Sequence, residues 1–167
     1  MRAKVISIVK QKGGVGKTTT AVNLATIMAV MNKKVLLIDL DSQGNSSSGL
    51  GIKHDRRGVN IYHVLCSHES IDKAIIETEI PYLSIVSSNI NLAAAEMDLI
   101  KLVNREKVLK NSLGSAIENF DYIIIDCPPS LNLLTINALV ASKEVIIPML
   151  CDFYSLEGLS HLLKTIV

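Results

Sequence analysis

Short apolar runs alternate along the chain with longer stretches of helical periodicity. The runs are rich in β-branched residues, which is typical of buried strands. They cover 4–10, 34–41, 82–88, 143–149 and the first part of 120–130. The last of these stretches, 120–130, ends in a turn. Helical patterns cover 17–33, 91–118 and 131–141, with shorter ones near 59–66 and 70–78 and a last one from near Ser155. The pattern predicts an α/β fold with a mainly parallel sheet and helices on both faces.

Two stretches interrupt this alternation. Residues 42–58 are rich in Ser, Gly and Asn, which predicts a long surface loop. Loops of that length inside a compact domain are often functional. We expect His54, Arg56 and Arg57 within it to form a small solvated basic cluster. The second interruption is a break in the helical stretch 91–118, near Asn104 or Gly114.

Composition narrows the class of protein. The chain has 167 residues, which is enough for one domain with a real core. Its 17 basic and 16 acidic residues give a net charge of +1, so a whole-domain electrostatic footprint for nucleic acid is excluded and only a local basic patch remains open. Three widely spaced cysteines, Cys66, Cys127 and Cys151, favour reduced thiols. No apolar run reaches the ~18 residues of a membrane span, so we expect a soluble cytoplasmic protein.

The segment 11-QKGGVGKTTT-20 follows a predicted strand and opens a predicted helix, which is the setting of a phosphate-binding loop. Glycines let the backbone approach a ligand closely, and successive N–H groups at a helix start face an anion. We expect Lys17 to reach the β- and γ-phosphates of a nucleotide, Thr18 to ligate Mg²⁺ and Thr19 to bond the α-phosphate. The expected nucleotide contacts are therefore Gly13, Gly14, Val15, Gly16, Lys17, Thr18 and Thr19.

The loop departs from the common pattern G-x-x-x-x-G-K-[ST] at its first position. Gln11 occupies the position where that pattern requires glycine. An additional lysine, Lys12, directly precedes the double glycine. The loop thus carries two lysines, and the pattern assigns a phosphate only to Lys17.

Three aspartates follow predicted strands and are candidates for the rest of the site. Asp126 ends the apolar run 122-YIIID-126, at the edge of the sheet where ligands of such folds bind, and a carboxylate there can hold a Mg²⁺-bound water. Pro128 and Pro129 would stiffen the segment that follows. Asp39 and Asp41 are two residues apart, so on a strand both would face one side. One would orient or deprotonate the attacking water, and the other would bond the loop or, as a weaker assignment for Asp39, the metal shell.

Four motifs in order resemble the deviant Walker A ATPases of the ParA/Soj/MinD group, and most closely the ParA/Soj-type partition proteins. The matching segments are 12-KGGVGKTT-19, 38-IDLDSQGN-45, 121-DYIIIDCPPS-130 and 147-IPMLCDFYSLEGL-159. They span essentially the whole chain. The one small departure is Ser42, where the family commonly has proline.

The resemblance implies a role for the additional lysine and for the aspartates. In this family the residue matching Lys12 reaches the nucleotide of a second subunit, so that an ATP-dependent homodimer encloses two ATP molecules with Mg²⁺. Asp41 would position the hydrolytic water, Asp126 would be the Walker B carboxylate, and 41–51 would be a switch loop. The implied function is a slow, partner-stimulated ATPase that partitions DNA, stimulated by a ParB-type centromere-binding protein, nucleoid-associated and without a membrane partner.

The end of the chain affects how much of this can be carried over. The segment 161-HLLKTIV-167 lies inside an apolar helical pattern with no stop signal, so we expect residues 1–167 to form a single P-loop ATPase domain that lacks the C-terminal portion of the family domain. In the family, that portion supplies much of the adenine pocket and the basic residues for non-specific DNA binding. A helix that frays at the terminus is the alternative explanation.

Two other functions remain open at this point. The nitrogenase iron protein shares the loop and bridges a cluster between subunits. Cys127 and Cys151 are the candidates for such electron transfer, although the chain has no cysteine motif for it. A shortened, non-hydrolysing paralogue could act instead as a binding or regulatory protein. Such a chain would expose an unpaired edge strand.

Overall fold

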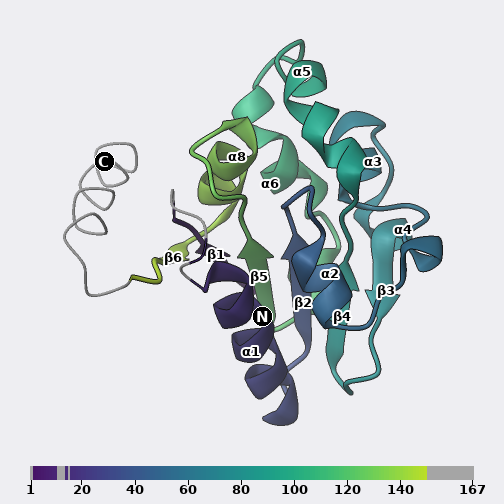
Figure 1. Cartoon of the computed structure of the whole chain (residues 1–167), viewed down its shortest axis with the longest axis vertical. Helices are drawn as coiled ribbons and strands as arrows, with labels where there is room; N and C mark the ends of the chain where they lie inside the picture. The colour runs from purple at the N-terminus through teal and green to yellow at the C-terminus, as the bar shows by residue number, and fades with distance from the viewer. Residues whose placement is uncertain (1, 11–13, 15, 150–167) are drawn as a thin grey trace.

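The computed structural model describes residues 2–10, 14 and 16–149, and these build a six-stranded sheet in the order β3-β4-β2-β5-β1-β6 (Figure 1). Five strands run parallel, and the edge strand β3 is antiparallel to β4. The predicted α/β fold with a mainly parallel sheet is confirmed. The strands are β1 (Lys4–Ile8), β2 (Val35–Asp39), β3 (Ile75–Glu77), β4 (Leu83–Val86), β5 (Tyr122–Asp126) and β6 (Glu144–Ile146).

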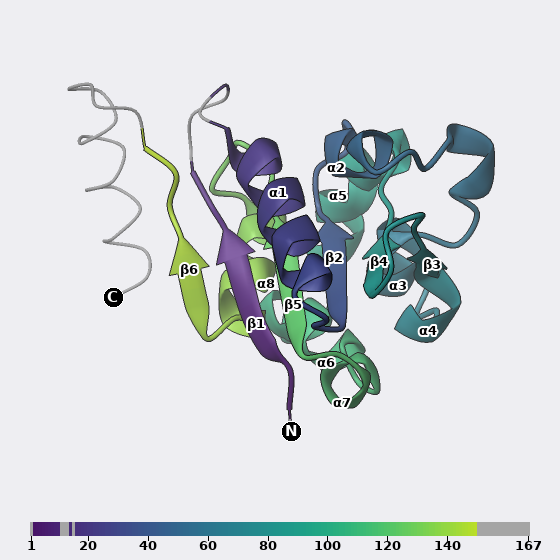
Figure 2. The same ribbon diagram turned by 90° about the horizontal axis from the view of Figure 1, so that it is seen from below.

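Helices cover both faces of the sheet, as Figure 2 shows. The long helix α1 (Lys17–Val30) packs its alanines, Ala21, Ala25 and Ala29, on one face. The larger hydrophobic core lies on the other face, beneath several short helices. These are α3 (Ile61–Cys66), α5 (Ala95–Leu99), α6 (Val108–Ser112), α7 (Ala116–Asn119) and α8 (Leu133–Ala141).

Strand register brings the carboxyl ends of β1, β2 and β5 together. Asp126 pairs with Ile8 on one side and with Asp39 on the other. The segments that leave these three strands, and that contain the sequence motifs, therefore start side by side at one edge of the sheet. Apolar, β-branched strands suit this position because the parallel sheet is buried on both faces.

One of two helical stretches differs from its sequence-based prediction. The helix predicted over 70–78 is α4 (Ile71–Ala74), and β3 follows it directly. The helical prediction was wrong there because pairing with β4 satisfies the backbone of Ile75 and Ile76, and their partly buried β-branched side chains suit a strand. The predicted break in 91–118 occurs at both positions, since Asn104 and Gly114 each have positive φ. This stretch contains η2 (Ile90–Ala94), α5, η3 (Arg105–Lys107), α6 and α7.

The predicted surface loop 42–58 is folded rather than open. It contains α2 (Asn45–Gly49) and η1 (His54–Arg56), and Ser46, Ser47 and Arg57 are buried. His54 and Arg56 are exposed, as expected. Arg57 was expected to be solvated, and that prediction was wrong: its side chain is 4% exposed because its guanidinium group bonds the loop itself.

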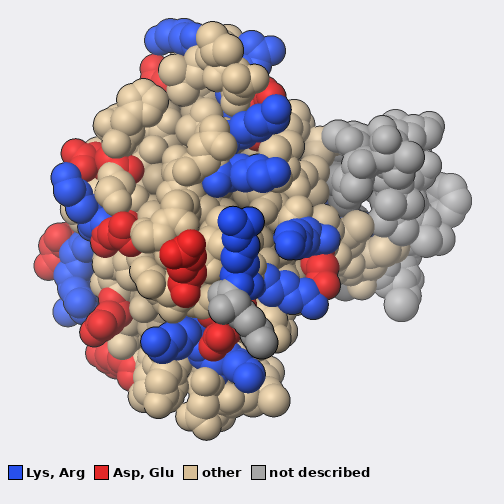
Figure 3. All heavy atoms as spheres, turned by 180° about the vertical axis from the view of Figure 1, so that it is seen from behind, with Lys and Arg blue, Asp and Glu red and all other residues tan. Residues whose placement is uncertain are grey.

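The surface carries charges of both signs. Basic and acidic side chains both occur on the face shown in Figure 3. Ion pairs among the described residues include Lys4–Glu144 at 2.6 Å and Lys73–Glu69 at 2.9 Å. Within the described part of the chain, no helix is long and apolar enough to cross a membrane.

Candidate functional site

A pocket of about 450 Å³ lies where the glycine loop, the segment after β2 and the segment after β5 meet. Its position is the carboxyl edge of the parallel strands, where ligands of open α/β sheets bind. The residues that line it come from three of the four motifs found in the sequence: Gly14, Gly16, Lys17, Thr18, Thr19, Asp41, Gln43, Asn45 and Pro129.

The glycines of the loop adopt a conformation that other residues resist. Gly14 has φ 74° and Gly16 has φ 81°, and a Cβ at either position would meet no other atom within 4 Å. Glycine is therefore favoured by backbone conformation and not by lack of space. Gly16 is also the N-cap of α1 and has no side chain to bond the first N–H groups of the helix. Donors at the start of a helix suit a phosphate, and Gly16, Lys17, Thr18 and Thr19 all line the pocket.

Lys17 begins α1 and is largely buried, at 7% exposure. Burial lowers the pKa of its ammonium group, and the carboxylates of Asp126 and Asp41 act against that shift. The same two carboxylates are thus close enough to interact electrostatically with the lysine. The site thus combines the Lys17 cation, two carboxylates and a helix N-terminus. This combination suits a metal-bound phosphate, because the cation and the helix N-terminus attract the phosphate and the carboxylates attract the metal.

Asp126 lies at the end of β5 and is 1% exposed. Its Oδ2 accepts a hydrogen bond of 2.7 Å from the Ser46 hydroxyl, whereas its Oδ1 is buried and has no hydrogen-bond partner among the described residues. Burial raises the pKa of this carboxyl, and the Ser46 and Thr18 hydroxyls oppose the shift. An unsatisfied buried carboxylate oxygen beside a threonine hydroxyl fits a Mg²⁺ ion held directly or through water.

Asp39 and Asp41 do not share one environment, so the expectation that both would face the phosphates was wrong. The strand ends at Asp39, and Asp41 lies in the bend that follows, half-buried at the pocket. Asp39 is fully buried, and its carboxylate accepts hydrogen bonds from the Ser47 amide at 2.8 Å, the Ser47 hydroxyl at 2.7 Å and the Asp41 amide at 3.3 Å. Asp39 therefore bonds the loop, which is one of the two roles expected for it, and its weaker assignment to the metal shell stays a prediction.

The buried position of Asp39 also changes its acidity. Removal from water raises its pKa to about 7, and the hydrogen bonds from Ser47 oppose that rise. The charge of neighbouring Asp126 raises it further. The sheet edge thus holds two coupled carboxyls, of which one supports the loop and the other faces Thr18 and Lys17.

Part of the predicted site cannot be placed. Lys12, Gly13 and Val15 lie outside the described residues. Sequence reasoning in turn missed Ser46 and Ser47, because their role depends on α2 folding back over the strand ends. Gln43 and Asn45 lie within the motif 38-IDLDSQGN-45, which is the one signal that could have identified them.

The cysteines offer little to an electron-transfer function. Cys127 is 1% exposed and belongs to the large hydrophobic core, where burial raises the pKa of its thiol well above the usual value. A cluster ligand shared between subunits must be a thiolate at the surface. Cys151 lies outside the described residues.

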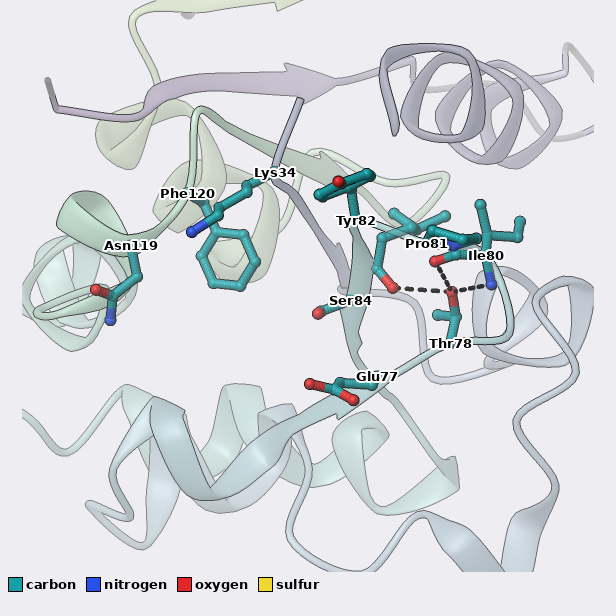
Figure 4. Close-up of a pocket in the computed structure, with 10 residues that line it drawn as sticks. Lys34, Glu77, Thr78, Ile80, Pro81, Tyr82, Ser84, Asn119 and Phe120 are labelled. Carbon is teal, nitrogen blue, oxygen red and sulfur yellow. Dashed lines mark hydrogen bonds between the residues drawn. The ribbon is translucent and has the colours of Figure 1, made fainter. Parts of the chain in front are cut away.

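A second pocket, of about 420 Å³, lies at the opposite, amino-terminal edge of the sheet (Figure 4). It is lined by residues just before β2, β4 and β5, including Lys34, Tyr82 and Phe120. The Thr78 hydroxyl points into the turn of the neighbouring hairpin, where it bonds the Leu83 carbonyl at 2.8 Å. This pocket contains none of the motif residues, so we place the candidate site at the other edge.

Comparisons with known proteins agree with the motifs. The protein-family model described as "AAA domain" matches residues 3–167. The chain is 50% identical over 163 residues to the sporulation initiation inhibitor protein Soj of Bacillus subtilis, and it covers 64% of that protein. It is 49% identical over 163 residues to the chromosome partitioning protein ParA of Myxococcus xanthus and covers 58% of it. In both cases 98% of this chain is aligned, so the chain spans about three fifths of the length of these relatives.

Solved structures show the same fold. The chain superposes with a TM-score of 0.93 and 37% identity on the cobyrinic acid a,c-diamide synthase of Mycobacterium smegmatis with bound ADP and magnesium, covering 98% of this chain and 66% of that one. It superposes with a TM-score of 0.90 and 37% identity on a plasmid partition protein of Borrelia burgdorferi, covering 99% and 73%. The P-loop fold predicted from the sequence is thereby confirmed.

Proposed function

The chain belongs to the ParA/Soj family of partitioning ATPases, and we propose that it binds Mg²⁺-ATP and hydrolyses it slowly as a switch. The observation that carries the proposal is the pocket in which the loop residues Lys17 and Thr18 meet Asp41 at the end of the sheet that also holds Asp126. Phosphoryl transfer depends mainly on positioning and charge stabilisation, and these residues supply both.

Each residue has a distinct part in the proposed reaction. The N–H groups at the start of α1 and the Lys17 ammonium bind the phosphates and stabilise the charge that develops on them. Thr18 and Asp126 would hold Mg²⁺, the latter through water, and the ion would neutralise phosphate charge when bound. Asp41 orients the attacking water or accepts its proton, since it is the half-buried carboxylate that lines the pocket.

The proposal extends to a second copy of the chain. Lys12 would reach the nucleotide of the other subunit, so that ATP links two copies, because the γ-phosphate attracts a cation from the partner. The further partners proposed are a ParB-type centromere-binding protein and non-specific DNA, which would place the chain in the cytoplasm at the nucleoid. They rest on membership of the ParA/Soj family, whose relatives named above are longer than this chain.

Calorimetry with Mg²⁺-ATP tests the binding step. We expect saturable binding by the wild-type chain and a loss of at least tenfold in affinity for Lys17→Ala, with Mg²⁺-GTP titrated for comparison. The exposed Lys53→Ala variant is the matched control and should bind as the wild type does. No binding by a folded wild-type chain would contradict the proposal.

Turnover and self-association test the remaining steps. Asp41→Ala should bind Mg²⁺-ATP but lose most phosphate release, and Lys12→Ala should remain monomeric in ATP during size-exclusion chromatography with light scattering. Unchanged turnover and dimerisation in both variants would contradict the switch mechanism. Binding without any turnover in the wild type would favour the non-hydrolysing paralogue.

A further inference from the structure

Arg57 is a buried cation near the end of the stretch 42–58, whose first residues line the pocket. Its side chain is 4% exposed, and none of the ion pairs found among the described residues includes it. A buried charge is costly unless its donors are satisfied, and an arginine kept inside without an acidic partner needs several well-placed acceptors. The hydrogen-bond acceptors of Arg57 show which segments of the chain its side chain connects.

Among the described residues, the four hydrogen bonds of the guanidinium group go to neutral acceptors in two segments. Nε and Nη2 donate to the Ile52 carbonyl at 3.1 and 2.9 Å, and Nη2 also donates to the Ser48 hydroxyl at 2.8 Å. Nη1 donates to the Ser88 carbonyl at 3.1 Å, just beyond the end of β4. The planar fork of arginine thus joins the end of α2 and the turn after it to the sheet edge.

A short chain of hydrogen bonds leads from Arg57 to Asp41. The Ser48 hydroxyl, which accepts from Arg57, donates to the Gly44 carbonyl at 3.0 Å. The Gly44 amide in turn donates to the Asp41 carbonyl at 2.9 Å. The Gln43 amide bonds the Asp41 carboxylate at 3.0 Å. The turn that presents Asp41 to the pocket is therefore supported from behind by Arg57.

Gly44 shows how closely the arginine packs against this turn. A Cβ at Gly44 would clash with Nη1 of Arg57 and would lie 3.1 Å from the Ser88 carbonyl oxygen. Gly44 has φ 62°, which also favours glycine. Its neighbours Gln43 and Asn45 both line the pocket. Glycine at this position thus allows the guanidinium group to lie directly beneath the wall of the pocket.

We propose that Arg57 is a positioning residue that holds the segment 41–52 against the sheet edge, so that Asp41 faces the phosphates in the orientation that hydrolysis requires. Lys17 and the glycine loop, which would bind the phosphates, lie on other segments. Arg57 should therefore affect the chemical step more than nucleotide binding. The proposal rests on the proposed ATPase function, but its structural part can be tested without nucleotide.

The first test compares Arg57→Ala with Arg56→Ala, whose exposed neighbouring side chain makes it a matched control. For Arg57→Ala we expect kcat to fall about tenfold while the Kd for Mg²⁺-ATP changes less than about threefold, since misplacing a catalytic group costs rate more than binding. Arg57→Lys keeps the charge without the fork and should recover part of kcat. Equal losses in kcat and affinity, or no loss, would overturn the proposal.

The second test is amide hydrogen exchange of the full chain without nucleotide. Arg57→Ala should exchange at least about tenfold faster across 44–52, where the Ser48, Leu50 and Ile52 amides are bonded within the segment, while the β5 amides keep their protection. Gly44→Ala should reproduce the effect by displacing the guanidinium group. Unchanged exchange in a folded Arg57→Ala chain would refute the positioning role. If the wild-type chain does not bind ATP, the proposed function is rejected. The exchange experiment, which uses no nucleotide, still tests whether Arg57 holds the segment in place.

Discussion

Two aspartates on neighbouring strands show how the surroundings of a residue give the same side chain different roles. Asp39 and Asp126 pair in register, and both are almost completely buried. Asp39 is bonded by Ser47 and by the Asp41 amide, so that it supports the loop. Asp126 keeps one oxygen without a partner among the described residues, so that it can face a ligand. Hydrogen bonding, and not residue type, distinguishes the structural carboxyl from the candidate functional one.

The raised pKa of Asp39 predicts the pH dependence of stability in the chain without nucleotide. Its pKa is about 7 in the folded state, against about 3.9 in an unfolded chain. Between these values the unfolded state releases a proton that the folded state keeps, so the free energy of unfolding should fall as pH rises from 4 to 7. The raised pKa of Asp126 acts in the same direction. Urea titrations across this range check the sign, and Asp39→Asn should flatten the curve; stability that rises with pH would contradict the assignment.

Ser46 predicts a pH-dependent effect on metal binding. Its hydroxyl bonds Asp126 Oδ2 and lowers the pKa of that carboxyl. Ser46→Ala should therefore raise the pKa and weaken Mg²⁺-dependent nucleotide binding by about three- to tenfold, with a larger loss at pH 6 than at pH 8. Ser112→Ala, which removes a remote serine that bonds the Val108 carbonyl, is the control. An equal loss at both pH values would show that Ser46 acts on packing alone.

At the scale of elements, asparagine caps fix where two helices begin. The Asn132 side chain accepts from the Thr135 amide at 3.1 Å and starts α8 just after the segment that brings Pro129 to the pocket. Asn60 starts α3 in the same way, with a capping box completed by His63. By contrast α1 starts at a glycine, whose missing side chain leaves the helix N-terminus open to a phosphate.

Removal of a cap should cost stability without loss of the fold. We expect Asn132→Ala to lower the free energy of unfolding by about 1 kcal/mol, whereas Asn132→Asp should retain most of it. Chemical denaturation of both variants measures the difference. The comparison variant is Asn104→Gly, at a residue with φ 56° where glycine relieves the backbone, and it should be neutral or slightly stabilising. A cap variant as stable as the wild type would mean that tertiary packing alone sets the start of α8.

At the scale of the whole molecule, the site joins segments that are more than one hundred residues apart. Lys17, Asp41 and Asp126 come from different strand–loop–helix units, and only the parallel sheet brings their ends together. A ligand that bonds all three units at once should stabilise the entire domain, because it binds the folded state and not the unfolded chain.

Mg²⁺-ATP should therefore raise the thermal midpoint of the whole chain in one transition. At a concentration one hundred times Kd the gain is about 2.7 kcal/mol, which corresponds to a shift of roughly 5–10 °C for a chain of this size. Differential scanning calorimetry would detect it, and Lys17→Ala should reduce it by about half or more at the same nucleotide concentration. A stabilisation that stays undiminished in that variant would place the nucleotide at another site.

The sequence predicted much of this molecule from local pattern. Short β-branched runs, glycines and four spaced motifs predicted the parallel sheet, the phosphate loop and the residues Lys17, Thr18, Asp41 and Asp126. It mispredicted the segments whose structure depends on distant partners. Residues 75–77 form a strand because β4 offers an unpaired edge, and Arg57 is buried because Ser88 and Ile52 offer acceptors.

The sequence by itself determined most of the elements, the class of fold and the position of the glycine loop, because periodicity, glycine content and motif spacing act over a few neighbouring residues. Only the tertiary structure decided that Asp39 supports the loop while Asp41 lines the pocket, and that Ser46 and Arg57 brace the same edge. The physical reason is that burial and hydrogen-bond partners set the state of a polar side chain. Those partners come from strand ends that lie far apart in the sequence.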